Sequence, residues 1–384
     1  MSSPHERYAA RIAAARSDEV VSSLVDRVDP ASDVPLVRWI RRYGRFHPGR
    51  QPWAQVVVQA APLELRRLDL HNHAVPGAVL DAELGPVAVG RPTDDPALPG
   101  LGVVLDQLDD AEIIRYRPGK RCTLRGGTAA GSWFVKVAPD GERLCREAND
   151  LVGAAERGEL GFAVAPMSRW DDATESMWQG VVPGEPVVDD VLGPEGPAMA
   201  RRLGAALGSL ARSGVRPEST ASEQDQLDRT GRAVRRVEER IPALSQRVRA
   251  VMAQLEERHG ALDRAPLVPV HGAPHVNQWL SAGDQLGLVD FDRFALGEPE
   301  LDIATFVAEL ASESERQAPV DAYTSAMVEG YCEVGVTIDV PRIELHLLHK
   351  LVAKVTRTAW ALRVDGPERA ARHLAVVEER LATP

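Results

Sequence analysis

Apolar and polar positions follow a helical period at the start of the chain and lose it soon afterwards. Over residues 5–28 apolar residues recur at helical spacing among charges, which predicts a helix that ends before Asp29-Pro30. We expect a second short helix from Val34 to Tyr43, then strands at 63–68 and 87–89. Residues 1–100 therefore form, in this interpretation, an N-terminal extension that packs on the next domain, with docking of a partner as the alternative.

The pattern changes near Glu112 to short segments rich in β-branched and aromatic residues. Turn signals at Pro118-Gly119 and at 126–131 separate these segments, which predicts an antiparallel meander of three strands. A helix is expected next, at 141–155, and then two more strands, at 162–167 and 175–182.

Beyond the Pro-Gly-Glu-Pro break at 183–186 the chain is mainly helical. Helical spacing covers 197–213, 221–258 and the region from 301 to the end, interrupted by the segment 268–292. Strands first and helices later is the order of an α+β fold.

Composition narrows the class of protein. The 384 residues, 44% hydrophobic and 26% charged, are typical of a soluble globular protein with two or three lobes. A net charge of −11 argues against a nucleic-acid partner, which needs a basic face. The three cysteines, Cys122, Cys145 and Cys332, lack a C-x-x-C pair and indicate a reducing compartment. Since neither a signal peptide nor an apolar run of roughly 18 residues is present, we expect a cytoplasmic protein without a membrane partner.

Two places in the chain carry candidate chemistry. Lys136 lies among apolar residues of a predicted strand, where its ammonium is costly unless it meets an anion; an exposed strand lysine is the alternative. Asp290 and Asp292 alternate at a strand end, so period two places both on one face, with Phe291 opposite. Such a pair suits Mg²⁺; a solvated turn, or neutralisation of Asp292 by Arg293, is the alternative.

The segment His271-Gly272-Ala273-Pro274-His275-Val276-Asn277-Gln278, followed by Asp290-Phe291-Asp292, resembles the aminoglycoside phosphotransferase/choline kinase family. The loop of that family reads H-G-D-x-H-x-x-N, and its next strand ends in D-x-D. The resemblance implies a bilobal protein-kinase-like α+β fold that uses ATP and Mg²⁺. It places an N-lobe of antiparallel sheet and helix at 101–183. A mainly helical C-lobe with the catalytic loop and the substrate site occupies 184–384.

The resemblance also implies roles for residues of the N-lobe. Lys136 binds the α- and β-phosphates of the nucleotide and pairs with Glu147, although Glu142 lies on the same predicted helix. The turn that contains Gly119, Lys120 and Arg121 lies over the phosphates; a solvated hairpin turn is the alternative. The segment 178–184 resembles the hinge between the lobes, and its residues Gln179 and Val181 contact adenine.

In the C-lobe the resemblance makes Asp290 the primary metal ligand, with Gln278 at the position of the usual Asn and Asp292 as a further ligand. His271 anchors the catalytic loop, and His275 faces the site. Asp302, at the start of a predicted helix, caps that helix or braces the loop.

Ala273 occupies the position of the catalytic Asp and has no proton-accepting group. Losing a general base costs roughly 10² to 10⁴ in rate, whereas binding of nucleotide and metal does not depend on it. Three explanations stay open: an introduced Asp-to-Ala change, a natural variant with a substitute base such as His275, or a pseudokinase.

The expected function is phosphorylation of a hydroxyl group by ATP and Mg²⁺. The acceptor is a small molecule such as an aminoglycoside or a sugar, or a peptide Ser/Thr in lanthipeptide-like natural-product biosynthesis. The alternative is a catalytically impaired pseudokinase that binds nucleotide, peptide or a partner enzyme.

Overall fold

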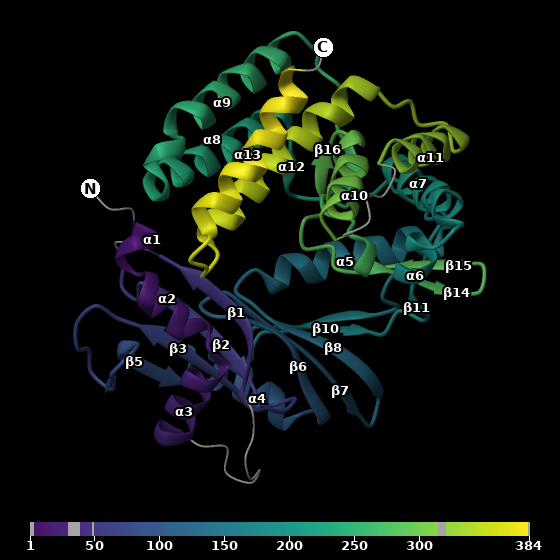
Figure 1. Ribbon diagram of the computed structural model, residues 1–384. Coiled ribbons are helices and arrows are strands. Elements are labelled where there is room, and N and C mark those ends of the chain that lie inside the picture. The colour runs from purple at the N-terminus through teal and green to yellow at the C-terminus, as the bar shows by residue number, and fades with distance from the viewer. Residues whose placement is uncertain (1–3, 30–38, 48–49, 314–319, 383–384) are drawn as a thin grey trace.

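The computed structural model describes residues 4–29, 39–47, 50–313 and 320–382. Two five-stranded antiparallel sheets lie in the N-terminal half of that part of the chain, and long helices gather in the C-terminal half (Figure 1). This confirms the α+β class. None of the helices described is both long enough and apolar enough to cross a membrane.

The N-terminal region forms its own sheet, in the order β1-β2-β3-β5-β4. Three helices pack across it around a core that includes Trp39, Phe46 and Trp53 (Figure 1). The elements are α1 (Pro4–Arg7), α2 (Ala9–Arg16), α3 (Asp18–Val28), β1 (Ile40–Phe46), β2 (Ala54–Gln59), β3 (Leu65–Leu70), β4 (Val79–Asp81) and β5 (Gly85–Gly90).

The helix expected from Val34 to Tyr43 is wrong over its second half, because Ile40 to Tyr43 begin strand β1. Residues 34–38 lie outside the described part of the chain. Strand β1 pairs along Val56, Val57 and Val58 of β2, so tertiary pairing overrides the local pattern.

The second sheet has the order β6-β7-β8-β10-β9 and contains the predicted meander. Helix α5 lies against β9 and β10, and the short helix α4 precedes β6. Val57 and Leu65 of the first sheet pack against Ile113 and Tyr116 of the second, so the two sheets share a core. The elements are α4 (Leu101–Asp106), β6 (Asp109–Arg117), β7 (Arg121–Thr128), β8 (Gly131–Val137), α5 (Gly141–Glu156), β9 (Ser168–Asp171) and β10 (Ser176–Gly180).

The strand expected at 162–167 is also wrong. Ala163 makes a single bridge to Gly287, and the edge strand β9 begins only at Ser168. Pro166 interrupts the segment, because proline has no N–H to donate to a strand ladder.

The described part of the C-terminal half is a bundle of helices with two small three-stranded sheets. The period over 221–258 belongs to two helices, α8 and α9, because Ile241-Pro242 ends the first. The helices are α6 (Val188–Leu192), α7 (Gly196–Arg212), α8 (Glu223–Arg240), α9 (Ser245–Gly260), α10 (Glu300–Glu313), α11 (Val320–Glu333), α12 (Val340–Trp360) and α13 (Gly366–Ala382).

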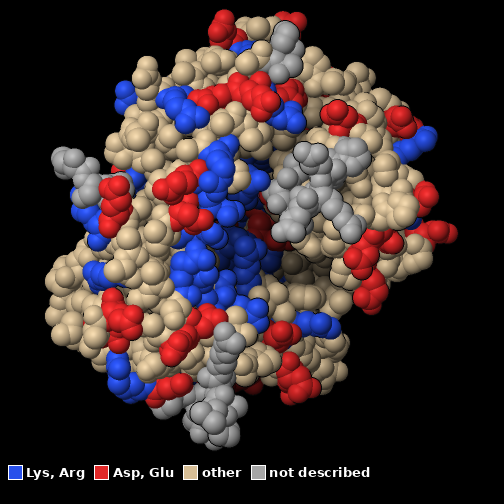
Figure 2. All heavy atoms as spheres, in the orientation of Figure 1, with Lys and Arg blue, Asp and Glu red and all other residues tan. Residues whose placement is uncertain are grey.

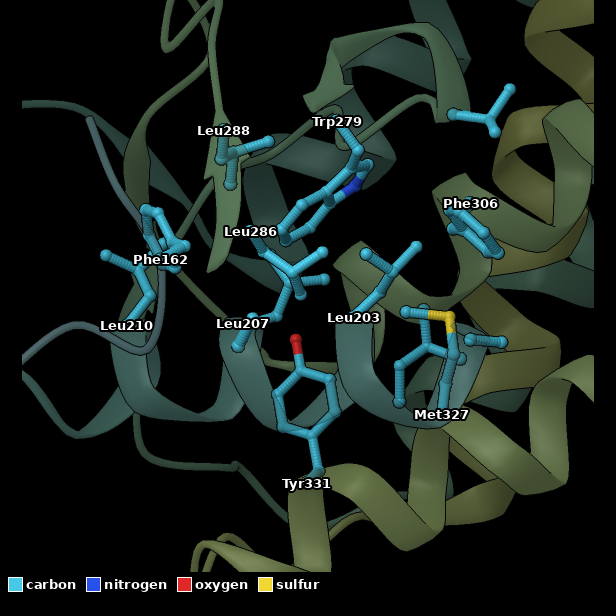
Figure 3. Close-up of a cluster of buried hydrophobic side chains, with 14 of the residues drawn as sticks. Phe162, Leu203, Leu207, Leu210, Trp279, Leu286, Leu288, Phe306, Met327 and Tyr331 are labelled. Carbon is cyan, nitrogen blue, oxygen red and sulfur yellow. The ribbon is translucent and has the colours of Figure 1, made fainter. Parts of the chain in front are cut away.

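A large apolar cluster fills the space between α7, α10, α11 and the hairpin of β14 (Trp279–Ala282) and β15 (Gln285–Leu288). Figure 3 shows Trp279 and Leu288 pointing into this cluster from the hairpin, with Tyr331 entering from α11. The cluster fixes the hairpin whose two ends carry the candidate chemistry.

The N-terminal sheet also touches the C-terminal helices. Arg45 of β1 forms a bridge with Ala361, Leu362 belongs to the core of the N-terminal sheet, and Arg240 of α8 donates a hydrogen bond to the carbonyl oxygen of Phe46. The N-terminal sheet therefore contacts both the second sheet and the helical half.

Candidate active site

Strand pairing brings the two motif segments together. The loop 271–278 joins β13 (Val268–Val270) to β14, and the segment 289–294 joins β15 to β16 (Ala295–Gly297). Because β13 pairs with β16 and β14 pairs with β15, both connections leave the same edge of these pairs. The loop and the aspartates therefore lie side by side.

Asp302, the first-turn residue of α10 that was expected to brace the loop, does so. Its buried carboxylate accepts the backbone N–H of His271 at 2.8 Å and that of Gly272 at 2.7 Å. Burial raises the pKa of Asp302 to about 7, although the two N–H donors act to lower it. The bracing role is confirmed.

His271 links the two segments. Its Nδ1 accepts the N–H of Ala273 at 3.4 Å, so its Nε2–H donates to the carbonyl oxygen of Val289 at 3.1 Å. Burial lowers the pKa of His271 to about 4, which keeps the ring neutral. His271 and Ala273 do not line the cavity described below, so their place is behind the reacting groups.

Asp290 and Asp292 converge on one ammonium. Lys136 Nζ lies 3.2 Å from Asp290 Oδ1 and also contacts Asp292, which in turn pairs with Arg121. Burial acts to raise the pKa of Asp290, but the charges of Lys136 and Arg121 outweigh it and lower the pKa to about 2. Asp290 therefore stays ionised, and both carboxylates share one cation position.

This convergence has a different origin from the one predicted. Strand β15 ends at Leu288, and Asp290 has φ +67°, a conformation that non-glycine residues adopt rarely. The expected strand end with alternating faces is therefore wrong. Phe291 is half-buried and stacks on Phe162 with ring centroids 6.3 Å apart, which anchors the turn between the aspartates.

Gln278 lines the cavity, but the oxygen of its side-chain amide points to the loop backbone, whereas a metal ligand needs that oxygen to face the ion. Its Oε1 accepts the backbone N–H of His275 at 2.8 Å, and its Nε2 donates to Asp290 Oδ2 at 3.1 Å. In this arrangement Gln278 orients Asp290 and closes the loop, and its carbonyl oxygen is already occupied. Its assignment as a metal ligand stays a prediction.

A cavity of about 560 Å³ lies between the second sheet and the helical half, with the aspartates at its polar end. Apolar side chains line the rest, among them Val164, Met177, Val182, Leu280 and Leu288. Of the residues predicted for the site, seven line this cavity: Arg121, Lys136, Gln179, His275, Gln278, Asp290 and Asp292.

The expected ion pair between Lys136 and Glu147 is not formed among the described residues. Glu147 is buried, lies 2.6 Å from Arg143 one turn earlier on α5, and accepts the backbone N–H of Glu218 at 3.1 Å. Because Arg143 already neutralises Glu147, Lys136 reaches across the cavity to the aspartates instead.

The turn at Gly119 is also anchored differently from the prediction. The Gly119 N–H donates to Asp95 Oδ2 at 2.7 Å, and the Tyr116 hydroxyl donates to the same oxygen at 2.8 Å. Asp95 is buried beside the N-terminal sheet, so this N–H is not available to a phosphate. Lys120 is exposed and does not line the cavity, whereas Arg121 does.

The segment after β10 runs along the apolar side of the cavity. Gln179 and Val182 line it, whereas Val181 does not. The side chain of Gln179 donates to Ser168 Oγ at 3.2 Å. The hinge role of Val181 stays a prediction, and its neighbour Val182 takes the position against the cavity.

Glu309 is the site residue that the prediction missed. It lines the cavity from α10, and its Oε1 lies 3.8 Å from Nδ1 of His275 and 3.5 Å from Arg357. A signal was present: Glu309 follows Asp302 by seven residues, two helical turns on the same face as the residue that braces the loop.

Several large or titratable side chains of the C-terminal helices belong to the interior or to side-chain stacks and do not line the cavity. Met327 and Tyr331 lie in the large apolar cluster (Figure 3). His346 binds Glu298 at 2.7 Å, and His349 binds the Thr230 hydroxyl at 2.6 Å. Trp360 lies beneath the guanidinium of Arg240, 3.6 Å from its ring centroid.

Comparison with known proteins agrees with this geometry. The sequence model of the phosphotransferase enzyme family (APH) matches residues 123–336, more than half of the chain. A glucosamine kinase from Streptacidiphilus jiangxiensis is 24% identical over 222 residues, which are 50% of this chain and 47% of that protein. The match therefore spans about half the length of that relative.

Two solved structures are similar in fold. An amicoumacin kinase, hAmiN, in complex with AMP-PNP, Ca²⁺ and Ami, superimposes with a TM-score of 0.58 at 14% identity, over 74% of this chain and 93% of that one. A choline/ethanolamine kinase family protein from Mesorhizobium loti gives 0.51 at 14% identity, over 75% and 93%. The chain therefore belongs to the phosphotransferase enzyme family and has the bilobal kinase-like fold that its catalytic-loop motif predicted.

Proposed function

We propose that this protein transfers the γ-phosphoryl group of ATP, with Mg²⁺, to a hydroxyl group of a small molecule. The observation that carries the proposal is the convergence of Lys136, Asp290 and Asp292 in a cavity whose other lining is mostly apolar. A nucleotide has the matching character, with an apolar base at one end and a charged polyphosphate at the other.

Both the volume and the lining of the cavity suit a nucleotide. Its volume of about 560 Å³ is within the usual range for sites of small ligands and cofactors. Met177, Val182 and Leu288 offer apolar contacts to the base. Lys136 and Arg121 are the cations that phosphate groups meet at the other end.

The donor set fits Mg²⁺. The carboxylates of Asp290 and Asp292 already share the position of one cation, and Mg²⁺ is usually held by one or two carboxylates together with substrate phosphates. Asp290 and Asp292 would hold the ion, and the ion would neutralise negative charge on the phosphates during transfer.

His275, oriented by Glu309, takes the place of the missing catalytic Asp at Ala273. Burial lowers the pKa of His275 below its ordinary 6.5, so the ring is neutral near pH 7. Its buried Nδ1 faces Glu309 at 3.8 Å, which directs Nε2 to accept the proton of the acceptor hydroxyl. Glu309 then stabilises the imidazolium that results.

The test is a calorimetric titration of ATP, with and without Mg²⁺, on the whole chain and on Lys136→Ala and Asp290→Ala. We expect Mg²⁺-dependent binding that both substitutions weaken at least about tenfold, because each removes a charge at the phosphate end. Asp284→Ala, in the exposed turn between β14 and β15, is the matched control. Equal affinity in all variants would contradict the proposal.

Ala273 favours a second candidate, a pseudokinase that binds nucleotide together with an acceptor, a peptide or a partner enzyme. Turnover distinguishes the two. If His275 is the base, His275→Ala stops phosphorylation and an added Ala273→Asp restores part of it. If the protein only binds, the whole chain forms no ADP with any hydroxyl compound, and Ala273→Asp alone starts the reaction.

Aminoglycosides, sugars and peptide Ser/Thr residues are the acceptor classes proposed for this site. The similarity to a glucosamine kinase and to an amicoumacin kinase supports a small molecule with a hydroxyl group. A panel of such compounds, followed by formation of ADP, is the direct measurement.

A further inference from the structure

Lys and Arg side chains gather in a hollow at the centre of the face shown in Figure 2, between the helical half and the sheets. The concentration is unexpected in a chain whose net charge is −11. Like charges held together in a protein repel one another unless anions neutralise them. Each member of the group therefore needs a physical reason for its place.

Several Lys and Arg side chains of this protein have one. The guanidinium groups of Arg240, Arg45 and Arg236 lie 3.6, 4.9 and 5.3 Å from the ring centroid of Trp360, where cation–π attraction holds them. Arg121 pairs with Asp292 in the nucleotide cavity. These cations stabilise contacts that the fold already uses.

Arg229 of α8, Arg293 after the aspartates, and Lys350 of α12 are different. None of the three has an ion pair within the part of the chain that the structure describes. Burial, opposed by the charge of Asp302 and reinforced by the charges of Arg293 and Arg229, lowers the pKa of Lys350 to about 8. Burial and the charge of Arg293 also lower the pKa of Arg229. Contacts place the three segments side by side: Thr230 and His349, the neighbours of Arg229 and Lys350, bind at 2.6 Å, and Thr220, whose carbonyl oxygen accepts from Arg229, pairs with Leu296 shortly after Arg293.

These cations adjoin the catalytic loop. Arg293 follows Asp292 directly, and its backbone packs so tightly on Gly272 that a Cβ there would overlap the Arg293 carbonyl oxygen. Lys350 acts electrostatically on Asp302, which holds the N–H groups of His271 and Gly272. Helices α8 and α12 bring the other charges to the same loop from the helical half, opposite the sheet that supplies Lys136.

We propose that Arg229, Arg293 and Lys350 form a subsite for a negatively charged group of the acceptor, so that the acceptor is a hydroxyl compound bearing a phosphate or a carboxylate. The proposal rests on the phosphotransferase function proposed above and specifies its substrate class. Arginine binds such groups through paired N–H donors, and lysine adds a third charge-assisted hydrogen bond. Among the acceptor classes proposed above, the subsite disfavours polycationic aminoglycosides, which these charges would repel.

The competing explanation is that these three cations bind the phosphates of the nucleotide. Filling the nucleotide site first separates the two explanations. The protein is first saturated with AMP-PNP and Mg²⁺ and then titrated with inorganic phosphate by calorimetry. A parallel titration with acetate tests the carboxylate in place of the phosphate. We expect phosphate to bind beside the nucleotide, and Arg293→Gln or Lys350→Gln to weaken it at least about tenfold, the usual effect of losing a hydrogen bond to a charged group.

Arg249→Gln, a substitution of an exposed arginine on α9, is the matched control and should leave phosphate affinity unchanged. Arg229→Gln changes a member of the three on the protein surface, which keeps the test valid if the Lys350 variant folds poorly. Normal binding of AMP-PNP with no binding of phosphate, or equal phosphate affinity in all variants, overturns the subsite alone. Failure of AMP-PNP to bind overturns the proposed function and the subsite with it.

Discussion

The buried carboxyl of Asp302 allows a quantitative check on how the catalytic loop is held. It accepts two backbone N–H groups of the loop, at 2.8 and 2.7 Å, and burial raises its pKa from 3.8 to about 7. The folded protein therefore binds this proton more tightly than the unfolded chain does. The contribution of Asp302 to the free energy of unfolding must therefore decrease as the pH rises from about 4 to about 7, and level off above that.

Asp302→Asn removes this titration while keeping the size of the side chain. Between pH 5.5 and pH 8 the unfolded carboxyl is ionised throughout, whereas the folded one ionises near pH 7. One pKa unit corresponds to about 1.36 kcal/mol, so ionisation destabilises the folded wild type by about 2 kcal/mol over this range. The stability advantage of wild type over the variant should shrink by about that amount between pH 5.5 and pH 8.

The assay is urea unfolding followed by tryptophan fluorescence at four pH values, with unchanged m-values as the condition for comparing the two proteins. Titrating groups that do not interact with Asp302 cancel in the difference between the variant and wild type. Asp284→Asn, in an exposed turn, should give a difference independent of pH. A pH-independent difference for Asp302→Asn as well would refute the assignment of a proton held by this carboxyl.

Three more outcomes follow from contacts at the site. His275→Ala should lower the rate of ADP formation by about 10² to 10⁴ without changing ATP affinity. Glu309→Gln should lower the rate less, because the base loses only its orienting partner. Equal rates in the wild type and both variants would contradict the assignment. Asp95→Ala should destabilise the fold by about 1–3 kcal/mol, because the buried hydroxyl of Tyr116 loses its acceptor, and by less at Gly119, whose N–H is only partly buried. ATP affinity should stay nearly unchanged; a large loss would show that the turn binds phosphate after all. Sulfate, which does not titrate in this range, should bind more weakly to the protein saturated with AMP-PNP as the pH rises from 7 to 9, because Lys350, facing Asp302, Arg293, Arg229 and Arg357, loses its proton near pH 8; Lys350→Met should abolish that dependence.

The order of elements and the two motif segments were predictable from local pattern, because each depends on residues close together in the sequence. The meander around Lys136, the helix at 141–156 and the brace at Asp302 are of this kind. Pairing partners were harder. Arg143, one turn from Glu147 on the same helix, forms the ion pair that was predicted for Lys136. Helical spacing alone does not decide which of the two cations pairs with Glu147.

Other features depend on contacts between distant segments. The N–H of Gly119 is taken by Asp95, which comes from the connection between the two sheets and had no motif to mark it. Strand β1 forms because it pairs with β2 in the sheet, and the hydrophobic periodicity over 34–43 does not reveal this pairing. Glu309 could have been predicted from the sequence, since helical geometry places it on the same face of the helix as Asp302, two turns further along.

The contacts of the N-terminal sheet close the molecule into a ring. The chain crosses from the sheet half to the helical half at 181–184, and the N-terminal sheet joins the same two halves a second time, through Val57 and Leu65 on one side and Phe46 on the other. Two halves that are joined at two separate places cannot rotate apart about a single hinge. Its halves should therefore melt in one transition, and substrates should reach the cavity through an entrance whose width changes little during turnover.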